Sequence, residues 1–240
     1  MLVNAYALGA GGGGGGTDPS FANVVLLLHC DGTDTDTTFI DSSSIANTIT
    51  AVGNAQIDTA KSKFGGASMQ CDGSNSHVTA ANTSDFTFGA DPWTVEMWIW
   101  IDPSGAGVER YLFSKYAFST VYECLLRIGS DGKFRVDGND GSGTLVYALE
   151  SASALATSQW IHVAVCRNGD DFRLFHGGIQ DGSTVTNSAT LGTGTGAVRI
   201  GARNNAGFPF IGWIDDVRVT NGVGRYTGTF TPPGAAFPDA

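Results

Sequence analysis

Short strand-like runs, joined by tight turns and without helical segments between them, constrain this chain more than any other feature. The clearest runs are Val24–Cys30, His77–Ala80, Trp93–Ile101, Tyr111–Tyr116, Val121–Gly129, Lys133–Asp137, Trp160–Arg167, Asp171–His176, Ala197–Ile200 and Trp213–Val219. Runs that recur about every 8–15 residues favour an antiparallel sandwich over a parallel sheet, which needs crossover helices. The sequence therefore predicts an all-β fold of two antiparallel sheets.

The last run opens the stretch Trp213–Pro233, which predicts how the domain closes. Strict alternation divides the run between two faces: Trp213, Asp215, Val217 and Val219 on one, and Ile214, Asp216 and Arg218 on the other. Asn221-Gly222 then supplies a turn, and Phe230 with the prolines that follow forms a stiff apolar clamp.

Two further runs carry polar residues that need an explanation. Trp93–Ile101 is apolar on both faces, which is typical of a central strand, and Glu96 is expected on its more open face as a hydrogen-bonded residue. His162 lies in the alternating run Trp160–Arg167. Since no nucleophile with an orienting acid stands near it in the sequence, we expect a structural role for His162.

The charge balance argues against two classes of partner. The chain has 13 Lys and Arg against 23 Asp and Glu, a net charge of -10. Nucleic acids and anionic membranes are bound through clustered basic residues, so neither is an expected partner. No apolar stretch is long enough to cross a bilayer, and the N-terminus lacks the pattern of a secretory signal.

The four cysteines, Cys30, Cys71, Cys124 and Cys166, lie far apart in strand-like runs and form no CxxC motif. This spacing argues against a zinc site and favours buried free thiols. A Cys30–Cys71 disulfide is the alternative, because both residues precede an Asp-Gly turn.

Residues 1–20 differ in composition from the rest and include six consecutive glycines, Gly11, Gly12, Gly13, Gly14, Gly15 and Gly16. Polyglycine has no side chains to pack and a high entropy cost of ordering. It is either a flexible linker with an apolar tip or an arm that becomes ordered on a partner surface.

Aspartates raise the possibility of a cation site. Asp31, Asp34, Asp36 and Asp41 stand within eleven residues, and Asp215 lies on an otherwise apolar face. Turn residues and a buried carboxylate that accepts hydrogen bonds from a nearby turn explain this pattern, and a structural Ca²⁺ ion is the alternative. The spacing of an EF-hand is absent.

Six segments, in order, resemble laminin-G-like domains of the concanavalin A-like type, in particular those of tailed-phage virion proteins. They are Leu26–Gly32, Lys63–Ser68, Trp93–Trp98, Trp160–Ala164, Arg199–Gly201 and Trp213–Pro233. The resemblance implies a jelly roll over residues 21–233, with an arm at 1–20 and a tail at 234–240. It also implies that the first and last strands are neighbours, which would bring Asp31 and Asp215 together as candidate Ca²⁺ ligands.

Some hydrolases share this fold, and they need two carboxylates placed for acid and nucleophile chemistry. The four glutamates, Glu96, Glu109, Glu123 and Glu150, form no such pair. Adjacent Asp215 and Asp216 are expected to point to opposite faces. We therefore expect that the protein is not an enzyme.

The resemblance implies a non-enzymatic virion component, a head decoration or fibre-like protein. It would be assembled in the host cytoplasm, anchored by its N-terminal arm, and displayed on the virion surface. Its partners would be other virion proteins and further copies of itself. The alternative is a carbohydrate-binding adhesin, for which Trp98, Trp100 and Tyr226 are the candidate stacking residues, with Trp213 and Tyr116 as further aromatic candidates. Aromatic residues on strands also serve as core residues.

Overall fold

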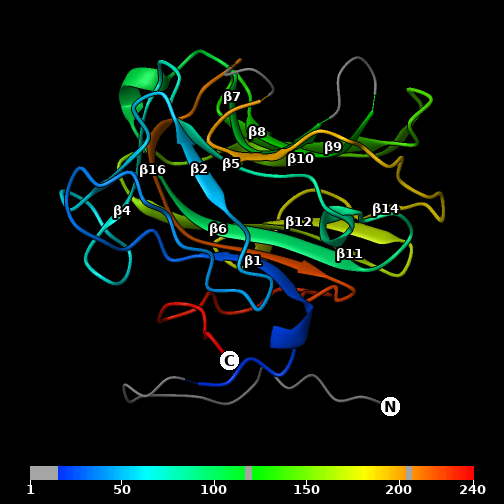
Figure 1. The fold of residues 1–240 in the computed structure, drawn as a ribbon. Helices are drawn as coiled ribbons and strands as arrows, with labels where there is room; N and C mark the ends of the chain where they lie inside the picture. The colour runs from blue at the N-terminus through cyan, green and yellow to red at the C-terminus, as the bar shows by residue number, and fades with distance from the viewer. Residues whose placement is uncertain (1–15, 117–120, 204–206) are drawn as a thin grey trace.

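The computed structural model describes residues 16–116, 121–203 and 207–240, and these fold into two antiparallel sheets packed face to face (Figure 1). Over the described residues, one sheet has nine strands along the path β13-β12-β11-β6-β16-β4-β3, with β1 beside β16 and β14 beside β12. The other has seven strands in the order β10-β9-β8-β7-β15-β5-β2. The predicted all-β jelly-roll sandwich is confirmed.

The elements have the following bounds. The strands are β1 Val24–Leu28, β2 Ile49–Val52, β3 Gln56–Asp58, β4 Ser68–Asp72, β5 His77–Ala80, β6 Trp93–Ile101, β7 Arg110–Tyr116, β8 Tyr122–Ile128, β9 Lys133–Asn139, β10 Leu145–Ala154, β11 Trp160–Asn168, β12 Asp171–His176, β13 Ile179–Gln180, β14 Val185–Thr186, β15 Val198–Ile200 and β16 Ile211–Asn221. Short 3-10 helices span Phe21–Asn23, Ser84–Phe86 and Pro103–Gly105.

The main core lies between the sheets and is built from alternate residues of each strand. In β6, Val95, Met97 and Ile99 enter this core, and each is fully buried. The intervening residues of β6 face outward from the nine-stranded sheet, as its alternation predicts. All four cysteines are buried free thiols, so the alternative disulfide does not form.

The first and last strands are neighbours, as expected. β1 pairs with β16 in antiparallel register, with Leu27 opposite Arg218 and Leu28 opposite Val217. The same strand, β16, also pairs with β6 and with β4. It is therefore the element that joins the two ends of the chain to the middle of the sheet.

The alternation predicted for β16 is wrong beyond Asp215, because the strand contains a β-bulge. Asp215 lies opposite Trp98, but Arg218 already lies opposite Glu96, so one extra residue is inserted between them. Asp216 has φ 49°, a left-handed conformation that is uncommon for a residue other than Gly. The bulge sends Val217 into the core and leaves both aspartates on the outer side of the sheet.

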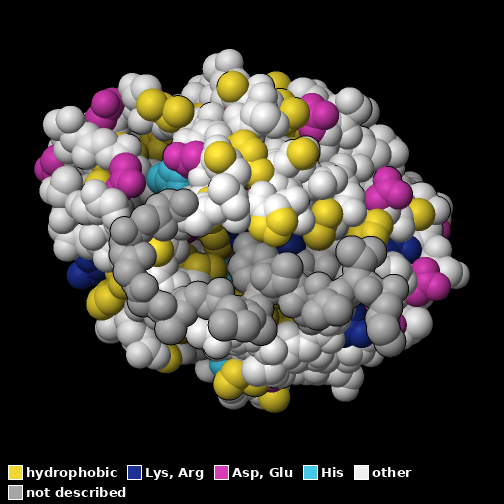
Figure 2. Space-filling model, turned by 90° about the horizontal axis from the view of Figure 1, so that it is seen from below, with side chains coloured by type: hydrophobic (Ala, Val, Ile, Leu, Met, Phe, Trp, Pro, Cys, Tyr) yellow, Lys and Arg dark blue, Asp and Glu magenta, His cyan; other side chains and the backbone are white. Residues whose placement is uncertain are grey.

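The outer face of the nine-stranded sheet is partly covered by the two ends of the described chain. The C-terminal tail and the segment before β1 lie beneath this sheet in Figure 1, and the Asp18 amide donates to the Ala240 carbonyl at 2.6 Å. Phe237 of the predicted tail 234–240 is buried against Val24 and Leu27. Figure 2, seen from this side, shows hydrophobic side chains reaching the surface at several places with few Lys or Arg among them.

A buried ionic network fixes the segments that cover the outer face to the nine-stranded sheet. The Arg218 guanidinium donates to the Glu96 carboxylate at 2.7 and 2.9 Å and to Asp18 at 3.1 Å. Arg225 also donates to Asp18, at 2.6 Å, and the Tyr226 hydroxyl donates to Glu96 at 2.6 Å. Burial is the largest single influence and would raise the pKa of Glu96. The charges of Arg218 and Arg225 and the hydrogen bond with His162 together outweigh it and hold that pKa well below its usual value.

We predict that Glu96→Gln lowers the free energy of unfolding by roughly 3 kcal/mol, because it removes the charge that compensates buried Arg218. Urea denaturation of wild type and variant measures this difference. The matched control is Glu150→Gln, whose ion pairs with Lys133 and Arg135 lie at the surface and are screened by water, so this variant should lose far less stability. Equal losses in the two variants would contradict the prediction.

Candidate ligand-binding face

A row of three tryptophans crosses the outer face of the nine-stranded sheet. Trp100 of β6 lies opposite Trp160 of β11 on one side and opposite Trp213 of β16 on the other. The rings of Trp100 and Trp160 meet edge to face, with centroids 6.0 Å apart. All three side chains are partly exposed, so ring surface is available on a face that the chain ends cover only in part.

The row continues in polar residues across the next two strands. Gln70 of β4 lies opposite Trp213, and Gln56 of β3 lies opposite Gln70, to which its amide donates at 3.3 Å. The Lys61 ammonium lies 4.6 Å from the ring centroid of Trp100 and 4.9 Å from that of Trp213. Aromatic faces therefore lie beside amide and ammonium groups within one surface.

Of the candidate stacking residues, Trp100 and the further candidate Trp213 lie in this row, whereas Trp98, Tyr226 and the further candidate Tyr116 are buried. Trp98 is 6% exposed beneath Phe64, whose ring it meets edge to face, and Lys63. Tyr226 is also 6% exposed and belongs to the ionic network through its hydroxyl group. Neither ring presents a face to a ligand, because loop and tail segments pack over both positions.

Trp160 and the two glutamines were not among the predicted site residues. Trp160 starts a strand, and alternation alone places it on the outer face. What makes it part of a site is the pairing register, which aligns it with residues about 60 and 53 positions away in the chain. No local sequence pattern carries that information.

Asp31 and Asp215 are neighbours, as the resemblance implied, but their surroundings differ from those of a Ca²⁺ cage. Asp215 Oδ2 accepts hydrogen bonds from the amides of Lys63 at 2.6 Å and Phe64 at 3.2 Å. Its Oδ1 is buried and has no hydrogen-bond partner in the described part of the chain, whereas Asp31 is exposed. Ca²⁺ takes 6–8 oxygen ligands, and the described residues contain no group of three or more His, Cys, Asp or Glu that could hold a metal. Calcium binding therefore stays a prediction without a fitting set of side chains.

The other aspartates of the 31–41 loop act as turn residues. Asp41 is buried and accepts hydrogen bonds from the amides of Leu27 and Ser43. Asp34 accepts from the Thr59 amide, and Asp36 accepts from the Thr38 amide. These bonds satisfy backbone donors within the loop and in the segments beside it, which is the role that short acidic side chains commonly have in turns.

The carboxylates are also poorly placed for hydrolysis. Glu96 and Glu123 are fully buried and hydrogen-bonded, and Glu109 and Glu150 pair with arginines. The expectation that Asp215 and Asp216 point to opposite faces is wrong, because the bulge turns both outward. Both are nevertheless buried, and Asp216 is bonded to His29 and to the Phe237 amide.

Residues 72–223 match the family model of the laminin G type described as the concanavalin A-like lectin/glucanases superfamily. This match covers well over half of the chain. The chain belongs to the concanavalin A-like lectin/glucanases superfamily. No curated protein matches the sequence of this superfamily member significantly.

Solved structures with the same concanavalin A-like fold share little sequence with it. The binding domain of Paraclostridial Mosquitocidal Protein 1 superposes with a TM-score of 0.66 at 14% identity, over 85% of this chain and 50% of that one. The receptor binding domain of botulinum neurotoxin D gives 0.65 at 14%, over 85% and 51%. The ligand binding domain of botulinum neurotoxin serotype D in complex with N-acetylneuraminic acid gives 0.63 at 15%, over 85% and 49%. This concanavalin A-like chain thus spans about half the length of the structures that it matches.

No helix within the described ranges of this concanavalin A-like chain is long and apolar enough to cross a membrane.

The pH dependence of stability should report the buried carboxyl of Asp215. Burial, together with the charges of Asp216 and Asp31, raises the pKa of Asp215 to about 7. The folded state therefore holds a proton that the unfolded state releases near the ordinary value of 3.8, so this group's stabilising contribution is complete below that value and is lost as pH rises toward 7.

We predict that Asp215→Asn, which keeps an acceptor oxygen, removes this pH-dependent loss. The difference in Tm between variant and wild type should move in favour of the variant as pH rises from about 4 to about 7. Thermal unfolding by circular dichroism across this range measures it. A difference that stays constant with pH would show that Asp215 does not titrate there.

Proposed function

We propose that this domain is a non-enzymatic carbohydrate-binding module and that the tryptophan row, Trp160, Trp100 and Trp213, is its binding surface. The observation that carries the proposal is the alignment of three partly exposed indole rings across adjacent strands of the outer face, beside the part that the chain ends cover. Exposed tryptophan is costly in water, so a row of it favours a ligand with apolar surface.

Sugars match the chemistry of this surface. The C–H face of a pyranose ring packs on an aromatic ring, and its hydroxyl groups exchange hydrogen bonds with side-chain amides such as Gln70. Lys61 offers three further donors beside the rings. Support also comes from the related fold of the botulinum neurotoxin serotype D domain, whose structure contains N-acetylneuraminic acid.

The setting that we propose is the surface of a phage particle, where the module would act as a decoration or fibre-like adhesin beside other virion proteins and further copies of itself. The phage-type resemblance of the sequence supports this setting. So does the position of Asp18 and Ala240, which lie together on the nine-stranded side. The seven-stranded sheet lies on the other side of the domain from these two residues (Figure 1).

We predict that Trp100→Ala weakens glycan binding at least about tenfold, because Trp100 is the central ring of the row. A glycan array identifies the ligand, and isothermal titration calorimetry of wild type and variant measures the loss. The control is Ile179→Ala, which truncates an exposed apolar side chain on edge strand β13 and should leave affinity unchanged. An array that stays blank with folded protein would overturn the proposed function.

The arm can be tested separately from the fold. Gly11–Gly15 lie outside the described residues, but Asp18 belongs to the buried ionic network. We predict that deletion of residues 1–15 abolishes association with particles while leaving Tm unchanged. Deletion of residues 1–20 should lower Tm as well, since it uncovers Arg218 and Arg225. Sedimentation of particles and thermal unfolding measure the two effects, and full incorporation of the shorter deletion variant would contradict the anchoring role.

A further inference from the structure

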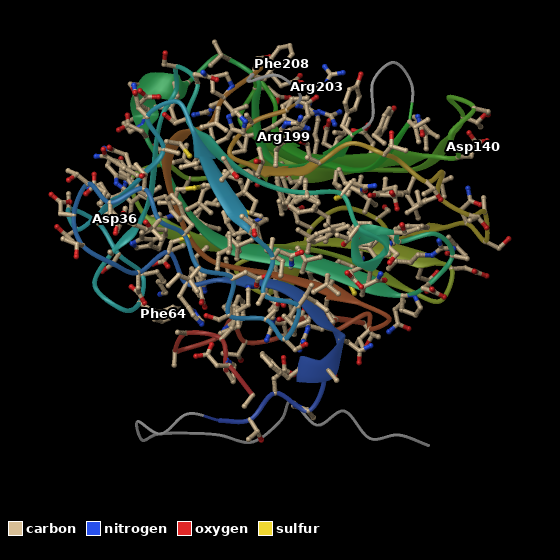
Figure 3. The ribbon with its side chains drawn as sticks, in the orientation of Figure 1. Asp36, Phe64, Asp140, Arg199, Arg203 and Phe208 are labelled. Carbon is tan, nitrogen blue, oxygen red and sulfur yellow. The ribbon has the colours of Figure 1, made fainter. Side chains whose placement is uncertain are left out.

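Arginine and aromatic side chains gather on the opposite side of the molecule, over the seven-stranded sheet. Figure 3 shows Arg199, Arg203 and Phe208 together along this upper surface, away from the C-terminus marked in Figure 1. Arg199 belongs to β15, and the other two belong to the segment that follows this strand. Tyr111 and Tyr116 of the adjacent strand β7 complete the group.

Arg203 is held among three aromatic rings. Its guanidinium carbon lies 5.6 Å from the ring centroid of Tyr111, 5.0 Å from that of Tyr116 and 5.8 Å from that of Phe208. A guanidinium stacked on rings keeps its N–H groups in its own plane, where they remain able to donate. The Nε atom of Arg203 is buried and has no hydrogen-bond partner among the described residues.

Phe208 is unusual in two respects. Its side chain is 47% exposed, and its backbone has φ 55°, a left-handed conformation that is strained for a bulky residue. The Phe208 carbonyl accepts a hydrogen bond from the Tyr111 amide at 3.0 Å, which holds the residue in this position. Strained residues that present an apolar side chain to solvent cluster at ligand sites.

The chain has a net charge of -10, yet the two arginines have no carboxylate partner within residues 16–116, 121–203 and 207–240. On the same sheet, Arg127 pairs with Glu109 and Asp137, and Arg135 pairs with acidic side chains too. Neither Arg199 nor Arg203 forms an ion pair with a carboxylate in the described part of the chain. Burial without a compensating charge lowers the pKa of Arg199, so an anion that reaches this surface would relieve an existing cost.

We propose that Arg199, Arg203 and Phe208 form a binding site for a carboxylate-bearing sugar, such as a uronic acid. The guanidinium groups take the carboxylate, since their planar N–H groups suit two oxygen atoms at once. The exposed Phe208 ring packs against the C–H face of the pyranose. Both groups are needed, because a simple anion would leave Phe208 without a partner and a neutral sugar would leave the two charges uncompensated.

The surface leaves room for a longer ligand. Arg127 stacks on the far side of this group, 5.9 Å from the Tyr111 ring centroid, and also lines a shallow hollow of about 240 Å³. Paired polar side chains surround the hollow: Arg127, Arg135, Asp137 and Glu150. Hydroxyl groups of a second sugar residue would find donors and acceptors there.

This site lies on a different sheet from the tryptophan row, so either can fail without the other. The test compares methyl β-glucuronide with methyl β-glucoside, which differ in a carboxylate against a hydroxymethyl group, by titration calorimetry of the full chain. We expect the glucuronide to bind at least about tenfold more tightly than the glucoside, and more weakly as salt concentration rises. Arg203→Gln and Arg199→Gln should each abolish this preference.

Two further variants separate an effect at this site from a general effect of charge and from misfolding. Arg173→Gln removes an arginine that pairs with Asp171 on β12 and should leave glucuronide affinity unchanged. Phe208→Leu, at an exposed position, should weaken binding without loss of fold, which covers the case in which an arginine variant does not fold. Equal affinity for the two glycosides, unchanged binding by Arg203→Gln, equal competition by inorganic sulfate, or loss of binding in Trp100→Ala would each overturn the proposal.

Discussion

The buried pairing of Glu96 with Arg218 is the interaction on which the outer side of the nine-stranded sheet depends. The two residues lie opposite each other on β6 and β16, and both are removed from water. Each also holds a segment outside the sheet, since Arg218 contacts Asp18 and Glu96 contacts Tyr226. Charged groups this deeply buried stabilise the fold only while every member is paired. The network therefore fixes where both ends of the chain lie, because displacing either segment would leave a buried charge without its partner.

The C-terminal tail and the segment before β1 decide which parts of the outer face of the nine-stranded sheet stay exposed. Tail and loop segments bury Trp98 and Tyr226, whereas the row Trp160, Trp100 and Trp213 stays partly exposed beside them. The other sheet presents Arg199, Arg203 and Phe208 on the side away from the C-terminus. The domain thus has two separate surfaces of different chemistry, one aromatic with amides and one aromatic with guanidinium groups. A ligand that bridged several copies on one particle would gain avidity without any new contact.

The β-bulge in β16 connects the fold to its titrating groups. One inserted residue sends Val217 into the core and leaves Asp215 and Asp216 side by side on the outer face. His29 then lies between Asp216 and Asp239, and the hydrogen bond with Asp216, against the opposing effect of burial, raises the pKa of His29 to about 9. The same bulge thus places Asp215, whose raised pKa favours the protonated carboxyl, directly before Asp216, which is bonded to the charged imidazole of His29.

The sequence by itself determined the fold class, the faces of β6 and β11, the pairing of the first and last strands and the burial of the cysteines. These follow from local alternation, and from a resemblance that spans most of the domain. It also singled out Trp100, because an outward position on a regular strand can be read from its neighbours. The bulge at Asp216 was not predictable, since an extra residue in one strand has no fixed sequence pattern. Nor were the burial of Tyr226, the tryptophan row and the lack of a carboxylate partner for Arg199 and Arg203 among the described residues. Each of these depends on register or on segments distant in the chain, and only the tertiary structure brings those together.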